Sequence, residues 1–105
     1  MAITIKSLYQ GVAGAALADT YIAPALTKGV VKSCVVTNST AGVVAFVAKG
    51  MTILAGTLRT MITRNLAVNE TYNCPELINF VMEAGGKIQM SGLNLEIVIS
   101  GLEIT

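Results

Sequence analysis

Apolar and polar residues alternate along several short segments of the chain, a pattern typical of strands with one buried face. Residues 3–9 place Ile3 and Ile5 on one side and polar side chains on the other. Residues 30–38 are rich in β-branched side chains, and residues 95–105 alternate like the first segment. Shorter strand candidates are residues 20–25, 43–49, 51–55, 58–63 and 86–91. We therefore expect a chain built mainly from strands.

Turn-forming residues separate these segments. Residues 38–42 (Asn-Ser-Thr-Ala-Gly) lie between two apolar runs. Asn, Ser and Gly favour turns for different local reasons, and two apolar runs joined by a short Gly-containing loop predict a β-hairpin. We expect the runs at residues 30–38 and 43–49 to form that hairpin.

One short helix is expected near residues 75–82. Pro75 suits a first helical position, Glu76 suits the positive end of the helix dipole, and Gly85 can end the helix. Strands do not alternate with long helices in this sequence, which argues against an α/β nucleotide-binding fold. About seven or eight short strands indicate one all-β domain over residues 1–105, an antiparallel β-sandwich of the jelly-roll or immunoglobulin-like type.

Several predicted strands are apolar on both faces, as in the pairs Val30/Val31, Val35/Val36 and Val43/Val44. An antiparallel sheet with one face in water is normally polar on that face. Either a neighbouring protein covers the second face, or the strand boundaries are shifted by one residue. We favour the covered face.

The composition also favours an assembled protein. Only 12% of the residues are charged and 53% are hydrophobic, whereas an ordinary soluble domain carries about 25% charged residues. A surface poor in charge is adhesive and is usually covered by partner subunits. The net charge is +1 and the basic residues are scattered, so we expect no nucleic-acid partner. The longest apolar runs are far shorter than the ~20 residues of a membrane helix, so we expect no membrane partner.

The sequence offers few groups for catalysis or metal binding. It has no histidine, the commonest general base and metal ligand. Cys34 and Cys74 cannot complete a zinc site alone, and we expect both to be buried thiols in a reducing compartment. Glu76 and Glu83 would share one helical face, where a solvated pair is far commoner than an acid–base site. We therefore expect a non-enzymatic protein with no catalytic residues, metal or cofactor.

Six segments together resemble the small virion proteins of tailed bacteriophages: residues 20–25, 28–33, 35–40, 74–77, 83–89 and 97–105. They cover most of the chain from Thr20 onward and consist of sandwich-like motifs rather than catalytic signatures. The resemblance implies a β-sandwich structural subunit of a virion that assembles in the bacterial cytoplasm. Capsid decoration (cement) proteins, neck or collar proteins and tail-fibre adaptors all have this character.

On this basis we expect a decoration protein that stabilises the capsid shell by binding neighbouring subunits. A neck, collar or fibre-adaptor subunit is the alternative, and a carbohydrate- or receptor-binding sandwich is an alternative from another class. The expected partners are the major capsid protein or neck proteins, and a homo-oligomer is expected. Residues 1–19 match the resemblance least and are a candidate docking arm. Candidate interface residues are Gly11, Ala13, Gly14, Ala15, Ala16, Val30 and Val44.

Overall fold

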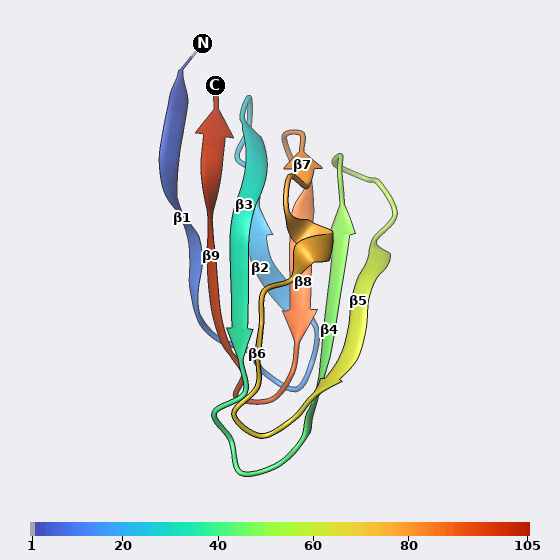
Figure 1. Cartoon of the computed structure of the whole chain (residues 1–105). Helices are drawn as coiled ribbons and strands as arrows, with labels where there is room; N and C mark the ends of the chain where they lie inside the picture. The colour runs from blue at the N-terminus through green and yellow to red at the C-terminus, as the bar shows by residue number, and fades with distance from the viewer. Residues whose placement is uncertain (1) are drawn as a thin grey trace.

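The chain folds into two antiparallel β-sheets that form a sandwich (Figure 1). The computed structural model describes residues 2–105. In chain order the elements are β1 (Ile3–Val12), β2 (Ala18–Ile22), β3 (Lys28–Thr37), β4 (Val44–Met51), β5 (Arg59–Leu66), β6 (Thr71–Tyr72), η1 (Pro75–Leu77), β7 (Val81–Met82), β8 (Lys87–Ser91) and β9 (Glu96–Ile104). Sheet A has the order β1-β9-β3-β6, with β7 also paired to β3, and sheet B has the order β2-β8-β4-β5. The predicted antiparallel β-sandwich is confirmed.

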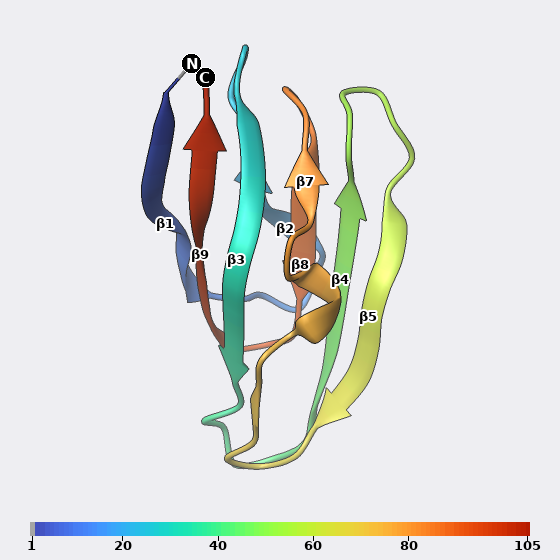
Figure 2. The same ribbon diagram turned by 45° about the horizontal axis from the view of Figure 1, so that its top comes forward.

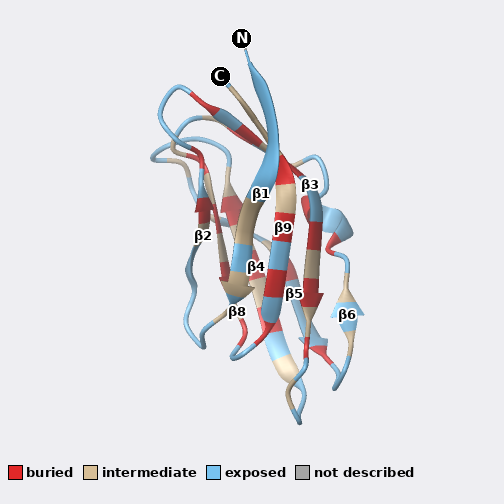
Figure 3. Cartoon of the chain, turned by 90° about the vertical axis from the view of Figure 1, so that its left-hand side faces the viewer, coloured by how far each residue is buried: buried red, intermediate tan, exposed pale blue. Residues whose placement is uncertain are grey.

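The hydrophobic core lies between the two sheets and is filled by alternate residues of the central strands. On β9, Ile97 and Ile99 are buried, whereas Glu96 and Val98 face outward. Figure 3 shows this alternation as buried and exposed bands along β9. Phe46 of β4 fills the core from sheet B and has no exposed surface. The period-two pattern in the sequence therefore identifies the inner face of β9 correctly.

The adjacent valine pairs divide between the two sides of their sheet. Val31 and Val36 of β3 are completely buried, while Val30 and Val35 are half-buried on the outer face of sheet A. Val43 lies just before β4 and is exposed. A shifted strand boundary therefore does not explain the valine pairs on β3. The outward-facing valines of β3 lie on the solvent side of the sandwich.

The helix expected near residues 75–82 is a single 3₁₀ turn, η1. Ile78 is already extended, and Asn79 follows in the left-handed region with a φ of 67°. Its N–H donates to the carbonyl of Val31 on β3, and the N–H of Val31 donates to the carbonyl of Phe80. Pairing with β3 replaces further helical hydrogen bonds, and the chain continues as β7.

The predicted hairpin of β3 and β4 does not form, because these strands belong to different sheets. Asn38, buried just after β3, holds the crossing loop. Its side-chain amide donates to the carbonyls of Gly42 and Leu66. Its backbone N–H donates to the Glu70 carbonyl, and its carbonyl accepts from the N–H of Asn69. These bonds fasten the loop to the β5–β6 connection, so the chain crosses from sheet A to sheet B.

The first strand belongs to the sandwich itself. β1 is an edge strand of sheet A, paired with β9 along its length, and it continues past the predicted end to Val12. Of the candidate docking arm, residues 3–12 form β1 beside β9 (Figure 2) and residues 18–19 begin β2 of the other sheet, while Met1 lies outside the described residues. The strand expected at residues 51–55 retains only Met51, the last residue of β4, and the chain then turns with Ala55 at a φ of 61°.

Phe46→Asp should unfold the protein, whereas Val35→Asp should leave it folded. Phe46 is completely buried, and an unpaired carboxylate there costs several kcal/mol of the ~5–15 kcal/mol that stabilise a small domain. Val35 is half-buried on the outer face, where a carboxylate stays hydrated. Thermal melting followed by circular dichroism measures both variants. A folded Phe46→Asp protein would contradict this placement of β4.

The two cysteines are buried free thiols, as the sequence predicts. Cys34 lies on β3, and Cys74 precedes η1 with its Sγ 3.8 Å from the carbonyl oxygen of Tyr72. The adjacent Cys74 thiol and burial raise the pKa of Cys34. Both side chains belong to the hydrophobic core, where they act as small apolar residues.

Thiol counting should give two thiols per chain when the protein is denatured without a reductant, because neither Cys34 nor Cys74 forms a disulfide in the structure. In the folded protein the same reagent should react slowly, because Cys34 and Cys74 are both buried. A chromogenic disulfide reagent measures both quantities. A count of zero in the denatured protein would show instead that the two cysteines are joined.

Candidate functional site

A row of apolar side chains crosses the outer face of sheet A. Ile5 of β1 lies opposite Leu102 of β9, and Leu102 also lies opposite Val30 of β3. Val30 in turn lies opposite Val81 of β7. Ile5 is 83% exposed and Val81 is 42% exposed. With the neighbouring pair of β1 and β9, these residues form what we call the apolar face: Ile3, Ile5, Val30, Val81, Leu102 and Ile104.

A polar row limits the apolar face on one side. Ser7, Ser100 and Ser33 lie opposite one another on β1, β9 and β3. At the other end of the sheet the outer face carries a smaller apolar group, in which Val98 of β9 lies opposite Val35 of β3. Monomeric proteins rarely expose contiguous apolar patches with a polar rim, and such patches are typical of contact surfaces.

Two β-bulges beside Gly101 decide which side chains reach the apolar face. β1 and β3 each have an irregularity next to the same part of β9. A Cβ atom at Gly101 would collide with the carbonyl oxygen of Val30, so glycine permits this close approach. A one-residue bulge moves the following side chains to the other side of the sheet. On β1 this turns Ile5 outward while Tyr9 packs against the core.

The inner side of the same region carries a polar network around Glu103 of β9. One carboxylate oxygen lies 3.2 Å from the ammonium of Lys6, and the other accepts a hydrogen bond of 2.5 Å from the hydroxyl of Tyr21. The Tyr21 hydroxyl, with a smaller effect from Lys6, holds the pKa of Glu103 below its ordinary value of 4.5. Burial and the hydrogen bond to Glu103 raise the pKa of Tyr21. Because Tyr21 belongs to β2, the network joins the two sheets.

Tyr21→Phe should destabilise the protein by about 1.5–3 kcal/mol at neutral pH, the usual contribution of a hydrogen bond to a charged group. Glu103 has a lowered pKa in the folded state. Its contribution is therefore complete above the unfolded pKa and is lost as the pH falls through the folded pKa. The difference from wild type should shrink from pH ~7 to pH ~3.

Urea denaturation at several pH values measures this difference. Tyr9→Phe, which also removes a hydroxyl from a half-buried ring, is the matched control. A loss of stability in Tyr21→Phe that stays constant with pH would contradict the charged network.

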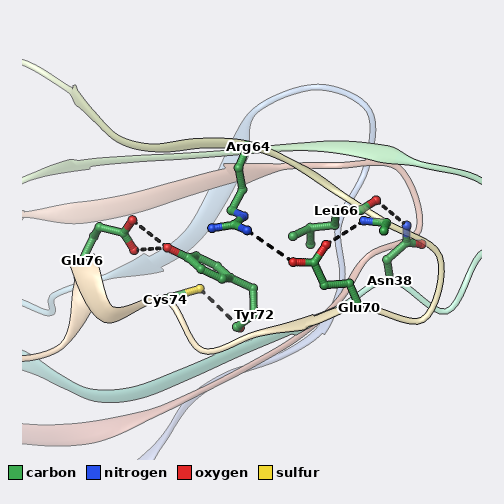
Figure 4. Close-up of polar contacts among 8 residues, drawn as sticks. Asn38, Arg64, Leu66, Glu70, Tyr72, Cys74 and Glu76 are labelled. Carbon is green, nitrogen blue, oxygen red and sulfur yellow. Dashed lines mark hydrogen bonds and ion pairs between the residues drawn. The ribbon is translucent and has the colours of Figure 1, made fainter.

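A second polar cluster joins β5 to β6 across the open side of the sandwich (Figure 4). The guanidinium carbon of Arg64 lies 4.2 Å from the centroid of the Tyr72 ring, a cation–π contact. A guanidinium nitrogen of Arg64 lies 3.3 Å from a carboxylate oxygen of Glu70. The hydroxyl of Tyr72 donates to Glu76 at 2.6 Å, which raises the pKa of Tyr72. Because Arg64 belongs to sheet B and Tyr72 to sheet A, this cluster ties the two sheets together.

The two carboxylates considered as an acid–base pair lie on different elements. Glu76 is on η1 and binds Tyr72, whereas Glu83 follows β7 and lies 3.7 Å from the ammonium of Lys28. In the part of the chain that the structure describes, no group of three His, Cys, Asp or Glu side chains is placed to hold a metal ion. Across residues 2–105, no helix has the length and apolar character needed to cross a membrane.

An open cavity of about 580 Å³ lies beside the apolar face at one end of the sandwich. Ile104 belongs to both the cavity wall and the apolar face. Leu26, which also lines the cavity, is 92% exposed. Ligand pockets usually bury most of their ligand, whereas this cavity extends the apolar face around the end of sheet A.

Of the interface candidates named from the sequence, only Val30 belongs to the apolar face. Val44 and Ala13 pack against the core, and Gly11 makes room for the Tyr9 ring. The other three are exposed in the loop from β1 to β2, next to the turn from β8 to β9: Gly14, Ala15 and Ala16. The candidates therefore do not form one surface.

Apart from Val30, the residues of the apolar face were not among the interface candidates named from the sequence. Alternation normally assigns the isoleucines of β1 to the core. The structure has the opposite arrangement there, because Lys6 joins Glu103 on the inner side. A signal was present in β9, where the buried positions Ile97 and Ile99 continue into Gly101 and Glu103. That phase leaves Leu102 and Ile104 on the outer face.

The chain matches no family model, no curated protein sequence and no solved structure. The surface of the sandwich offers an apolar contact area on sheet A and two polar networks whose acidic groups are already engaged by neighbouring side chains.

Proposed function

We propose that this chain is a non-enzymatic structural subunit of a tailed-bacteriophage virion, and specifically a decoration protein of the capsid shell. The apolar face carries the proposal, together with the resemblance of the sequence to virion sandwich proteins. Four strands supply one continuous apolar row, from Ile5 through Leu102 and Val30 to Val81. Rows of this kind on a rigid sheet suit a broad, flat contact with another protein.

Decoration would stabilise the shell by binding preferentially to its assembled form. Any ligand that binds one state better shifts the equilibrium toward that state by mass action. A sandwich seated across neighbouring shell subunits makes several contacts at once, so each contact can be weak and the complex still persists. The cross-sheet networks around Glu103 and Arg64 suit this role, because they hold the two sheets in a fixed arrangement.

The alternative of a sugar-binding module finds less support in the surface. Sugar rings usually stack on exposed aromatic side chains. Here Phe46 and Tyr21 are buried, and the remaining aromatic residues are half-buried: Tyr9, Tyr72 and Phe80. The apolar face is aliphatic, so protein contact is the better match.

Val81→Glu should weaken binding to the virion, because it places a charge at the β7 end of the apolar face. Losing the burial of one valine and desolvating a carboxylate should lower affinity by roughly 10- to 150-fold. Leu93→Glu is the matched control, since Leu93 is 55% exposed in the turn before β9, away from the apolar face. Co-sedimentation with shells of the phage that encodes the chain, stripped of this protein, measures both variants.

Equal binding of Val81→Glu and wild type would contradict use of the apolar face. Quantitative mass spectrometry of intact virions tests the position on the particle. Copies distributed over the whole shell are the expected result. A single ring of copies at the portal vertex would assign the chain to the neck or a fibre adaptor instead. Absence from the virion would contradict the proposed function.

A further inference from the structure

The free edge of β1 is the least protected strand edge of the sandwich. Natural proteins protect sheet edges with short strands, bulges and charged side chains. Among the other edges, β6 and β7 have only two residues each, β2 is short and bulged, and β5 carries Arg59 and Arg64. β1 has ten residues and a single charged side chain, Lys6.

Three residues of β1 point their backbone hydrogen-bonding groups away from the sandwich. Ala2 and Thr105 exchange both backbone hydrogen bonds, at 3.1 and 2.9 Å. In an antiparallel ladder, such pairs alternate with residues whose N–H and C=O groups point to the opposite edge. With the register of β1 on β9, the residues that face the free edge before the bulge are Ile3, Ile5 and Ser7.

We propose that two copies of the chain join through this edge, with the two β1 strands antiparallel about a twofold axis at Ile5. Ile5 then pairs with Ile5 of the second copy, and Ile3 pairs with Ser7. The two sheets A become one continuous sheet. Because the axis is perpendicular to that sheet, both apolar faces lie on the same side and merge. This association does not depend on the particle proposed above.

A second copy of this chain supplies what the edge requires. An added strand must offer free backbone donors and acceptors at alternate residues, and β1 itself offers them. An isologous contact also closes on itself, since the same surface patch serves both partners. The exposed isoleucine side chain of each copy then covers that of the other: Ile5 is 83% exposed in the single chain.

Charge complementarity selects the register. With the axis at Ile5, Lys6 of the second copy lies opposite Thr4, and Thr4 lies opposite Glu103 on β9. The Glu103 and partner Lys6 backbones are then two strand spacings apart, about 10 Å, within reach of two long side chains. The inner side of β1 thus brings a second cation toward a carboxylate. The next register would place Lys6 directly opposite Lys6, which is destabilising.

Sedimentation velocity of the purified full chain from ~1 µM to ~1 mM tests the association. Pairing of residues 3–7 alone buries less than the ~800 Å² per partner of a stable complex, so we expect a concentration-dependent shift to twice the chain mass of 10.9 kDa. Ile5→Lys should abolish the shift without lowering the melting temperature. Val12→Lys is the control, because Val12 is 58% exposed on the same strand and beyond the bulge.

Cysteine cross-linking tests the register. A mixture of the Thr4→Cys and Lys6→Cys variants should give a covalent dimer under mild oxidation, because residues 4 and 6 lie opposite each other in the proposed pair. Each variant alone should give much less. The native cysteines do not interfere, since Cys34 and Cys74 are both buried.

Three results would overturn the proposal. The first is a wild-type chain that stays monomeric over the whole concentration range. The second is an Ile5→Lys variant that associates like wild type, which would place the contact elsewhere. The third is efficient cross-linking of Thr4→Cys with itself, which would show a different register.

Discussion

The close approach of β1, β3 and β9 around Gly101 determines how the end of sheet A that contains residues 101–104 is built. β3 approaches β9 so closely there that a Cβ atom at Gly101 would strike the carbonyl oxygen of Val30, and Leu8 of β1 closes in from the other side. β1 and β3 both bulge next to this residue. Bulges increase local twist and re-aim side chains, so the region beyond Gly101 has inner and outer faces of its own.

The polar network and the apolar face are two consequences of that arrangement. Beyond the bulges, Lys6 and Glu103 point inward, where Tyr21 of sheet B completes their hydrogen bonding. The isoleucines of β1 consequently point outward, on the same side of the sheet as the even-numbered residues of β9. A polar inner side is acceptable at the end of the sandwich because every charged or hydroxyl group in the network has a partner. On the outer side, by contrast, aliphatic side chains such as Ile5 and Val81 remain exposed in the single chain.

The sequence predicted the parts of this fold that depend on local periodicity. The alternation of β9 and the β-branched run of β3 were located correctly, because burial on one face imposes a period of two. The hairpin and the longer helix were not, because tertiary hydrogen bonds override local preference. Asn38 hydrogen-bonds its loop to the β5–β6 connection. The backbone of Val31 forms hydrogen bonds with the backbone of Asn79 and Phe80. The β1 part of the apolar face was missed because its orientation depends on a bulge that no local pattern marks, whereas the alternation of β9 did indicate Leu102 and Ile104.

Most of the few charged side chains are already engaged in ion pairs within the chain. Four ion pairs join Lys6 to Glu103, Lys28 to Glu83, Arg64 to Glu70 and Lys87 to Asp19. They use eight of the chain's thirteen charged side chains, which comprise seven basic and six acidic residues. Charges satisfied within the chain contribute little to long-range attraction or repulsion of other molecules. Shape, aliphatic surface and unpaired strand backbone are then the main features available for recognition, and charge has a smaller part. These features suit permanent neighbours in an assembly, because they gain free energy from close packing rather than from electrostatic steering.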